Sequence, residues 1–161
     1  MTQEQVWKTL HDNLQGITDS LGTPIDEGIK ETVVALSVHD FLTLASCEGH
    51  LERGCCYPWV DVLLPTPKEE GEKIKKFLEN LLLEHSLYSD SGDARIVTVE
   101  FEPRKDGSVP VRLQSEGSLL LSRLPKEILT PQIKKKILER YQKEMDSFTN
   151  FLKEKFFPKR K

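Results

Sequence analysis

The chain has few cysteines, few aromatic residues and no long hydrophobic run, and these shortages exclude several classes of protein. Its three cysteines, Cys47, Cys55 and Cys56, are an odd number within ten positions, which does not suit the disulfide framework of a small secreted domain. No run of about 18 apolar residues is present to span a membrane. The first residues also lack the basic and apolar regions of a secretory signal. We therefore expect a protein of the reducing cytoplasm.

The remaining composition is that of a folded globular chain. Of its 161 residues, 37% are hydrophobic and 30% are charged, which is enough apolar material for a core and too much for a disordered chain. The length is that of one domain. We predict a single α+β domain over residues 1–157, followed by a basic tail at 158–161.

Charge is unevenly distributed. The net charge of −3 argues against a nucleic-acid partner. From Pro131 onward, ten basic and four acidic residues give +6, which leaves −9 for the rest of the chain. A solvated helix face with a basic tail accounts for this segment, and a phosphate-bearing partner is the alternative.

Apolar residues at three- and four-residue spacing predict four helices. Their starts carry capping threonines, followed in three cases by a proline: Thr2, Thr23-Pro24, Thr66-Pro67 and Thr130-Pro131. We expect the first helix to end at Gly22, the second near His39 and the last at Pro158.

Four short segments have the composition and alternation of strands: 41–45, 57–64, 96–101 and 109–113. In the second, alternation places Trp59, Asp61 and Leu63 on one face and Val60, Val62 and Leu64 on the other. Leu119 to Leu124 fits either a short strand or an irregular packed segment. The short connections favour antiparallel pairing. We predict an α+β fold in which a roughly four-stranded, mainly antiparallel sheet has helices packed on one face, in the order ααββαββα.

One loop concentrates the reactive side chains. Between the first two predicted strands, residues 46–56 contain all three cysteines, one of the four histidines and two glycines. Loops that leave a strand end are a common position for a site. Three chemistries are open.

The first is a metal site. Cys47 and His50 are separated by two residues, so a turn can direct both at one ion, with Cys55 or Cys56 as a further ligand. Thiolate and imidazole together suit zinc. The alternative is that the cysteines are small packed side chains.

The second is a nucleophile. Cys47 beside His50 can form a thiolate–imidazolium pair, with Asp61 or Glu48 orienting the ring. The alternative is a histidine that bonds a turn carbonyl.

The third is a ligand cradle. Ser46, the amides near Gly49 and Gly54, Arg53 and Trp59 can grip a small anion or a nucleobase. No phosphate-loop or dinucleotide fingerprint is present.

Little outside the loop points to chemistry. Asp26 and Glu27 lie in the first turn of the second predicted helix, where they favour its dipole; they can also point into the cleft beside the loop. His85 falls at a helix end, where it can cover free carbonyls.

Asp26 and the run Ala45-Ser46-Cys47-Glu48-Gly49-His50 carry a resemblance. This stretch, to Asp61, resembles uncharacterised bacterial proteins with a Ser-Cys-Glu-Gly-His signature. It is more remotely similar to the wybutosine-synthesis tRNA methyltransferase family, which has a Ser-Ser-Cys-Ser-Gly-Arg run. His50 stands where that family has arginine, and Ala45 where it has the first serine. The resemblance implies the place of a site in this loop rather than a tRNA substrate or S-adenosylmethionine.

Our leading hypothesis is a protein that binds a small polar or nucleotide-like ligand at the Ser46–Trp59 loop, with or without catalysis. Cys47 and His50 are its central pair, surrounded by Ser46, Glu48, Gly49, Arg53, Trp59 and Asp61. The alternatives are a non-enzymatic interaction module that uses the C-terminal helix, and a structural zinc site formed by Cys47, His50, Cys55 and Cys56.

Overall fold

The structure is a computed structural model that describes residues 1–17, 22–89 and 91–158. It confirms the predicted α+β class and the predicted order of helices and strands. The elements are α1 (Gln3–Gln15), α2 (Glu27–Val38), β1 (Leu42–Cys47), β2 (Trp59–Leu64), α3 (Lys68–Leu87), the 3-10 turn η1 (Gly92–Ala94), β3 (Ile96–Glu100), β4 (Val109–Ser115), the 3-10 helix η2 (Glu116–Arg123) and α4 (Pro131–Phe156).

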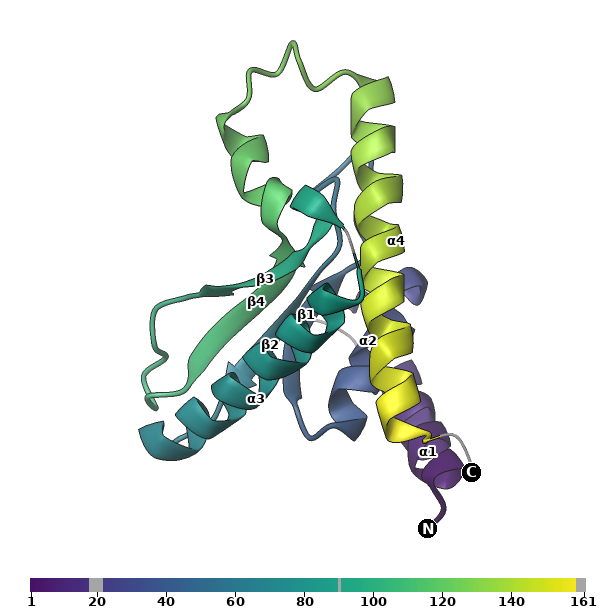
Figure 1. The fold of residues 1–161 in the computed structure, drawn as a ribbon, viewed down its shortest axis with the longest axis vertical. Helices are drawn as coiled ribbons and strands as arrows, with labels where there is room; N and C mark the ends of the chain where they lie inside the picture. Colours follow the sequence, from purple (N-terminus) through teal and green to yellow (C-terminus); the bar gives the residue numbers. More distant parts are fainter. Residues whose placement is uncertain (18–21, 90, 159–161) are drawn as a thin grey trace.

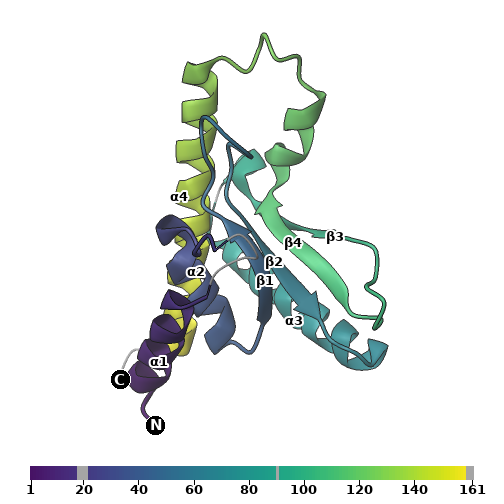
Figure 2. The ribbon, with the colours of Figure 1, turned by 180° about the vertical axis from the view of Figure 1, so that it is seen from behind.

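The four strands form one antiparallel sheet in the order β1-β2-β4-β3. Helix α3 crosses one face of the sheet and α4 runs beside it (Figure 1), while the opposite face turns toward the viewer in Figure 2. The predicted alternation in β2 is confirmed. Val60, Val62 and Leu64 are buried under the helices, and Asp61 pairs with Arg112 on the opposite face.

The core lies between the helix-covered face of the sheet and helices α2, α3 and α4. It is built from aliphatic side chains and a few aromatic ones, among them Ile29, Leu36, Phe41, Val60, Val62, Leu78, Leu113, Met145, Phe148 and Leu152. Burying this apolar surface is the main term that holds the layers together.

Two of the four predicted threonine caps are confirmed. Thr2 forms a capping box with Gln5, and the Thr130 hydroxyl accepts the N–H of Ile133. At the start of α3 the N-cap is Pro67 rather than Thr66, with no side-chain cap. Helix α2 begins at Glu27 rather than at Thr23-Pro24, because a distant part of the chain supplies the acceptors at its first turn, as described below.

The ends of two predicted segments also differ. Helix α1 ends at Gln15, with Gly16 as its C-cap; part of its predicted continuation, residues 18–21, lies outside the described residues. The predicted basic tail at 158–161 lies outside them too, apart from Pro158. Within the described ranges, no helix combines the length and apolar character needed to cross a membrane.

Most of the apolar stripe of the C-terminal helix α4 packs in the core. Tyr141, Met145, Phe148 and Leu152 are all buried, so this face is already occupied by the fold. The first turns of α4 stand clear of the sheet and are joined to η2 by an arch, residues 124–130 (Figure 1). The ambiguous Leu119–Leu124 segment is the end of η2 and the beginning of this arch.

Candidate functional site

Three potential metal-binding side chains meet where the β1–β2 loop passes the start of α2. Asp26 is the N-cap of α2, Cys47 ends β1, and His50 lies three residues further along the loop. One donor atom from each side chain lies within 4.8 Å of the other two. We call these residues the Asp26–Cys47–His50 cluster.

Hydrogen bonds from other parts of the chain hold the cluster in place. One oxygen of Asp26, Oδ2, lies 3.2 Å from Nε2 of His50 and accepts the backbone N–H of Glu48 at 3.1 Å. The carboxylate of Glu48 accepts the N–H of Gly28 at 2.7 Å. A carboxylate at this position satisfies a free amide and favours the helix dipole. The loop thus caps α2, which explains why the helix begins at Glu27.

Helix α4 and the loop itself add two further restraints. The side-chain amide of Gln142 donates to the carbonyl of Glu48 at 2.9 Å, and the N–H of His50 donates to the carbonyl of Cys55 at 2.8 Å. The loop therefore has a defined conformation set by β1, α2 and α4 together.

Gly49 is the position where the loop has no room for a side chain. Its φ of +88° lies in the left-handed region, and an added Cβ would stand 2.5 Å from Leu138 and 2.9 Å from the carbonyl carbon of Tyr57. Glycine is required here both for its backbone conformation and for the close approach of α4.

The Cys47 thiol has a negative surrounding. Burial raises its pKa above the ordinary value, the N–H of Gly49 partly opposes this, and the nearby groups Asp26, Cys55 and Glu48 raise the pKa further. A raised pKa keeps the thiol protonated at neutral pH. This setting is the opposite of the electropositive one that activates a catalytic cysteine.

The structure brings together only part of the predicted site. Asp61 lies elsewhere, on the open face of the sheet, where Arg112 binds it with two hydrogen bonds of 2.7 and 3.0 Å. The same guanidinium lies 3.8 Å from the centroid of the Trp59 ring. Neither Asp61 nor Glu48 orients His50, as the sequence had led us to expect, because both carboxylates are held by other donors and Asp26 lies against the ring.

The other predicted residues surround the cluster at different depths. Ser46 is half-buried and pairs with Val60 across the sheet. Arg53 is exposed, and no hydrogen bond or ion pair in the described part of the chain involves it. Cys55 and Cys56 are half-buried free thiols, and neither belongs to the Asp26–Cys47–His50 cluster.

Two cavities flank the cluster. The first, which we call the loop cavity, has a volume of about 420 Å³ and lies between the β1–β2 loop, η2 and the first turns of α4; His50, Cys55, Cys56, Tyr57 and Lys134 are in its wall. The second, the edge cavity, measures about 360 Å³, and its wall includes Asp26, Ser46 and Trp59. A ligand in either cavity would reach one member of the cluster.

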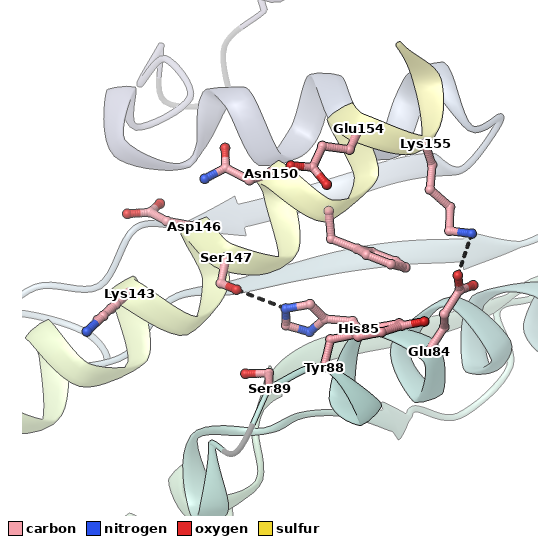
Figure 3. Close-up of a pocket in the computed structure, with 11 residues that line it drawn as sticks. Glu84, His85, Tyr88, Ser89, Lys143, Asp146, Ser147, Asn150, Glu154 and Lys155 are labelled. Carbon is pink, nitrogen blue, oxygen red and sulfur yellow. Dashed lines mark hydrogen bonds and ion pairs between the residues drawn. The ribbon is translucent and has the colours of Figure 1, made fainter. Parts of the chain in front are cut away.

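A larger cavity, about 770 Å³, lies apart from the cluster between the end of α3 and α4 (Figure 3). There, Nε2 of buried His85 lies 3.0 Å from Oγ of Ser147, and Nδ1 lies 3.8 Å from Glu144. An acid, a histidine and a serine in a row, here Glu144, His85 and Ser147, resemble the catalytic triad of a serine hydrolase. However, 3.8 Å is too long for a hydrogen bond, and the N–H groups beside Ser147 are used within α4. We interpret His85 as a packing residue that joins α3 to α4.

Comparison with known proteins identifies no relative: no family model, no curated protein and no solved structure matches this chain. What the structure itself shows is a small α+β protein in which an oxygen, a sulfur and a nitrogen donor lie close together.

Sequence reasoning undervalued one site residue and missed two others. Asp26 had a visible signal, an acid just before an apolar helical pattern, but the same signal fits a dipole role. Gln142 lies 94 positions from Glu48, and Lys134 lies about 80 positions from the loop residues that share its cavity wall; no local pattern marks either residue.

Proposed function

We propose that this protein binds a divalent transition-metal ion, zinc in the first place, through Asp26, Cys47 and His50. The observation that supports this is the meeting of three different donors from separate elements within 4.8 Å. Zinc bonds of 2.0 to 2.3 Å place neighbouring ligand atoms of a tetrahedral site roughly 3.3 to 3.7 Å apart. The 3.2 Å between Oδ2 of Asp26 and Nε2 of His50 is close to the lower end of this range.

Charge supports the same proposal. The charged neighbours that act on Cys47 are acidic, so its thiolate would have no positive partner among them. A divalent cation supplies that charge and removes the proton from the thiol as it binds. Without a cation, the thiol stays protonated, which favours a metal site over a thiolate–imidazolium nucleophile.

Three protein ligands leave a fourth position of a tetrahedral zinc ion open, as in catalytic rather than structural sites. We propose that a small polar ligand at the Ser46–Trp59 loop occupies this position. Because Cys47 must be reduced to bind a metal, and because all three cysteines are free, we also propose a reducing compartment, the cytoplasm, as the protein's location.

The test is zinc binding by chelator-treated protein, measured by competition with a zinc indicator. We expect one zinc per chain and a loss of at least tenfold in affinity, or about 1.4 kcal/mol, in each of Cys47→Ser, His50→Ala and Asp26→Asn. Cys56→Ser is the matched control and should bind as the wild type does. Cobalt substitution should give a sulfur-to-metal charge-transfer absorption that Cys47→Ser abolishes.

Two results would decide against this assignment. If the wild type takes up no zinc, there is no metal site. If Cys55→Ser weakens zinc as much as Cys47→Ser does while Asp26→Asn has no effect, the ligand set is Cys47, His50 and Cys55 instead. Thermal unfolding of each zinc-free variant distinguishes a lost ligand from a lost fold.

A further inference from the structure

The loop cavity has a chemical character that the metal cluster does not explain. Its wall is formed mainly by residues of the β1–β2 loop, η2, the arch of residues 124–130 and the start of α4; Figure 1 shows the arch joining η2 to α4. His50 belongs both to its wall and to the cluster. Its contents therefore lie beside any ion that the cluster binds.

The charge of the cavity wall is of one sign. Lys134 is half-buried in it, and no hydrogen bond or ion pair within the described residues engages its ammonium group. No carboxylate lines this cavity. The cavity between α3 and α4 differs, because Glu84, Asp146 and Glu154 accompany its two lysines. A half-buried lysine without an acidic partner can bind an anion through a charge-assisted hydrogen bond.

Neutral donors stand in the same wall. Burial, together with a hydrogen bond to Cys55, raises the pKa of Tyr57 to about 12, so its hydroxyl keeps its proton at neutral pH. Burial raises the pKa of Cys56, which Lys134 partly opposes. Tyr57 and Cys56 therefore add neutral, protonated groups to the wall that contains Lys134.

Four leucines give the wall an apolar part, beside the polar side chains of Gln114, Ser118 and Ser122. Leu51, Leu119, Leu121 and Leu129 are in the wall, and Leu51 and Leu119 keep about two fifths of their surface exposed, at 41% and 42%. Leucine surface that the fold leaves uncovered inside a cavity gains free energy when an apolar ligand covers it.

We infer that the loop cavity binds an organic anion, in which an apolar body rests on the leucines and a carboxylate or phosphate group pairs with Lys134. The inference rests on the proposed function in one respect: His50 would place the bound metal beside this ligand. The charge pairing with Lys134 does not depend on the metal.

The test uses two fluorescent probes that differ in charge. 8-Anilinonaphthalene-1-sulfonate is anionic, and N-phenyl-1-naphthylamine is its neutral counterpart. We expect the wild type to bind the anionic probe more tightly. Lys134→Gln should weaken the anionic probe about tenfold, the size of one lost charge-assisted contact, and leave the neutral probe unchanged. Lys136→Gln is the control, since Lys136 is an exposed residue of the same helix outside the cavity.

Displacement of the anionic probe then identifies the ligand class. Octanoate, octyl phosphate and octanol each have an eight-carbon chain. Octanoate ends in a carboxylate, octyl phosphate in a phosphate and octanol in an uncharged hydroxyl. We expect one of the two anions to displace the probe at lower concentration than octanol does. Equal displacement by all three compounds, or an unchanged anionic probe affinity in Lys134→Gln, would overturn the inference.

The same titrations with zinc-free and zinc-loaded protein keep the two proposals apart. Anion binding that depends on Lys134 in a protein that takes up no zinc would end the metal proposal alone. Zinc uptake with equal affinity for both probes would end the anion inference alone. Thermal unfolding of Lys134→Gln should match that of the wild type, because the Lys134 side chain forms no hydrogen bond or ion pair in the described structure.

Discussion

The carboxylate of Asp26 lies 3.2 Å from Nε2 of His50, although 24 positions separate the two residues. The same oxygen accepts the N–H of Glu48. One carboxylate thus connects the start of α2 with the β1–β2 loop and places a negative charge next to Cys47. This arrangement determines how the thiol behaves.

We predict that Cys47 in zinc-free protein reacts with a disulfide reagent at pH 7 more slowly than a free thiol, because burial and then its acidic neighbours raise its pKa. The thiolate fraction, and with it the rate, should increase as the pH approaches and passes 9. Asp26→Asn removes a group that raises the pKa and should accelerate the reaction. Mass spectrometry of the labelled peptide measures the rate at Cys47 separately from Cys55 and Cys56. A fast, pH-independent reaction near neutrality would instead indicate a thiolate–imidazolium pair.

Alanine substitutions at two glycines of the β1–β2 loop allow the cost of backbone strain to be measured apart from the cost of steric crowding. Both Gly49 and Gly54 have positive φ, but an added Cβ meets Leu138 and Tyr57 at Gly49 and no atom within 4 Å at Gly54. We expect Gly54→Ala to lower the free energy of unfolding by about 1 kcal/mol and Gly49→Ala by about 3 kcal/mol, since overpacking adds to the strain. Urea denaturation measures both. Equal losses of unfolding free energy in the two variants would mean that the Leu138 side chain moves aside at little cost.

The Asp61–Arg112 pair should matter for stability and not for the metal. Their side chains are only 12% and 23% exposed, so removing one partner leaves a poorly solvated charge. We predict that Asp61→Ala costs about 3 kcal/mol of unfolding free energy, whereas replacing both partners by apolar residues restores much of the loss. Zinc affinity of the folded Asp61→Ala protein should equal that of the wild type. A loss of zinc binding in a folded Asp61→Ala protein would instead show that Asp61 takes part in the metal site.

His85 should make stability depend on pH as the pH falls through and below its ordinary pKa of about 6.5. Burial lowers its pKa, and Glu144 opposes this in part. Because the neutral ring is favoured in the folded state, the contribution of His85 is complete above the unfolded pKa of about 6.5 and is lost as the pH falls toward the folded value. Asp146, whose pKa burial raises, acts in the opposite direction and nearer the carboxyl range.

The corresponding measurement is the urea midpoint across this pH range. We expect it to fall with pH in the wild type and to fall less in His85→Gln, with His11→Gln as the control at a more exposed position. If both variants follow the wild-type slope, His85 does not carry the pH dependence.

Several elements were predictable because their causes are local. Thr2 with Gln5 and Thr130 before Pro131 satisfy the amides of their own helices. Alternation along Trp59 to Leu64 assigns each side chain to a face, since successive strand residues point in opposite directions. Apolar spacing likewise indicated which side of α3 and α4 faces the core.

The start of α2 and the composition of the site were not predictable in this way. Thr23-Pro24 carries a helix-start signal, yet the helix begins at Glu27 because the carboxylate of Glu48 reaches its first turn. Asp61 was predicted as a site residue because it lies close to the loop in sequence, but the pairing of β2 with β4 places it beside Arg112. His85 is buried against Ser147 of α4 rather than covering the end of its own helix.

The sequence by itself thus determined the elements, their order and the loop that carries the reactive groups, because helix caps, turn residues and periodicity act over a few positions. Only the tertiary structure decided that Asp26 joins Cys47 and His50 and that Lys134 faces the same loop. Hydrogen bonds and charges act over a few ångströms of space, and the packing of α2 and α4 against the sheet sets which distant residues come that close.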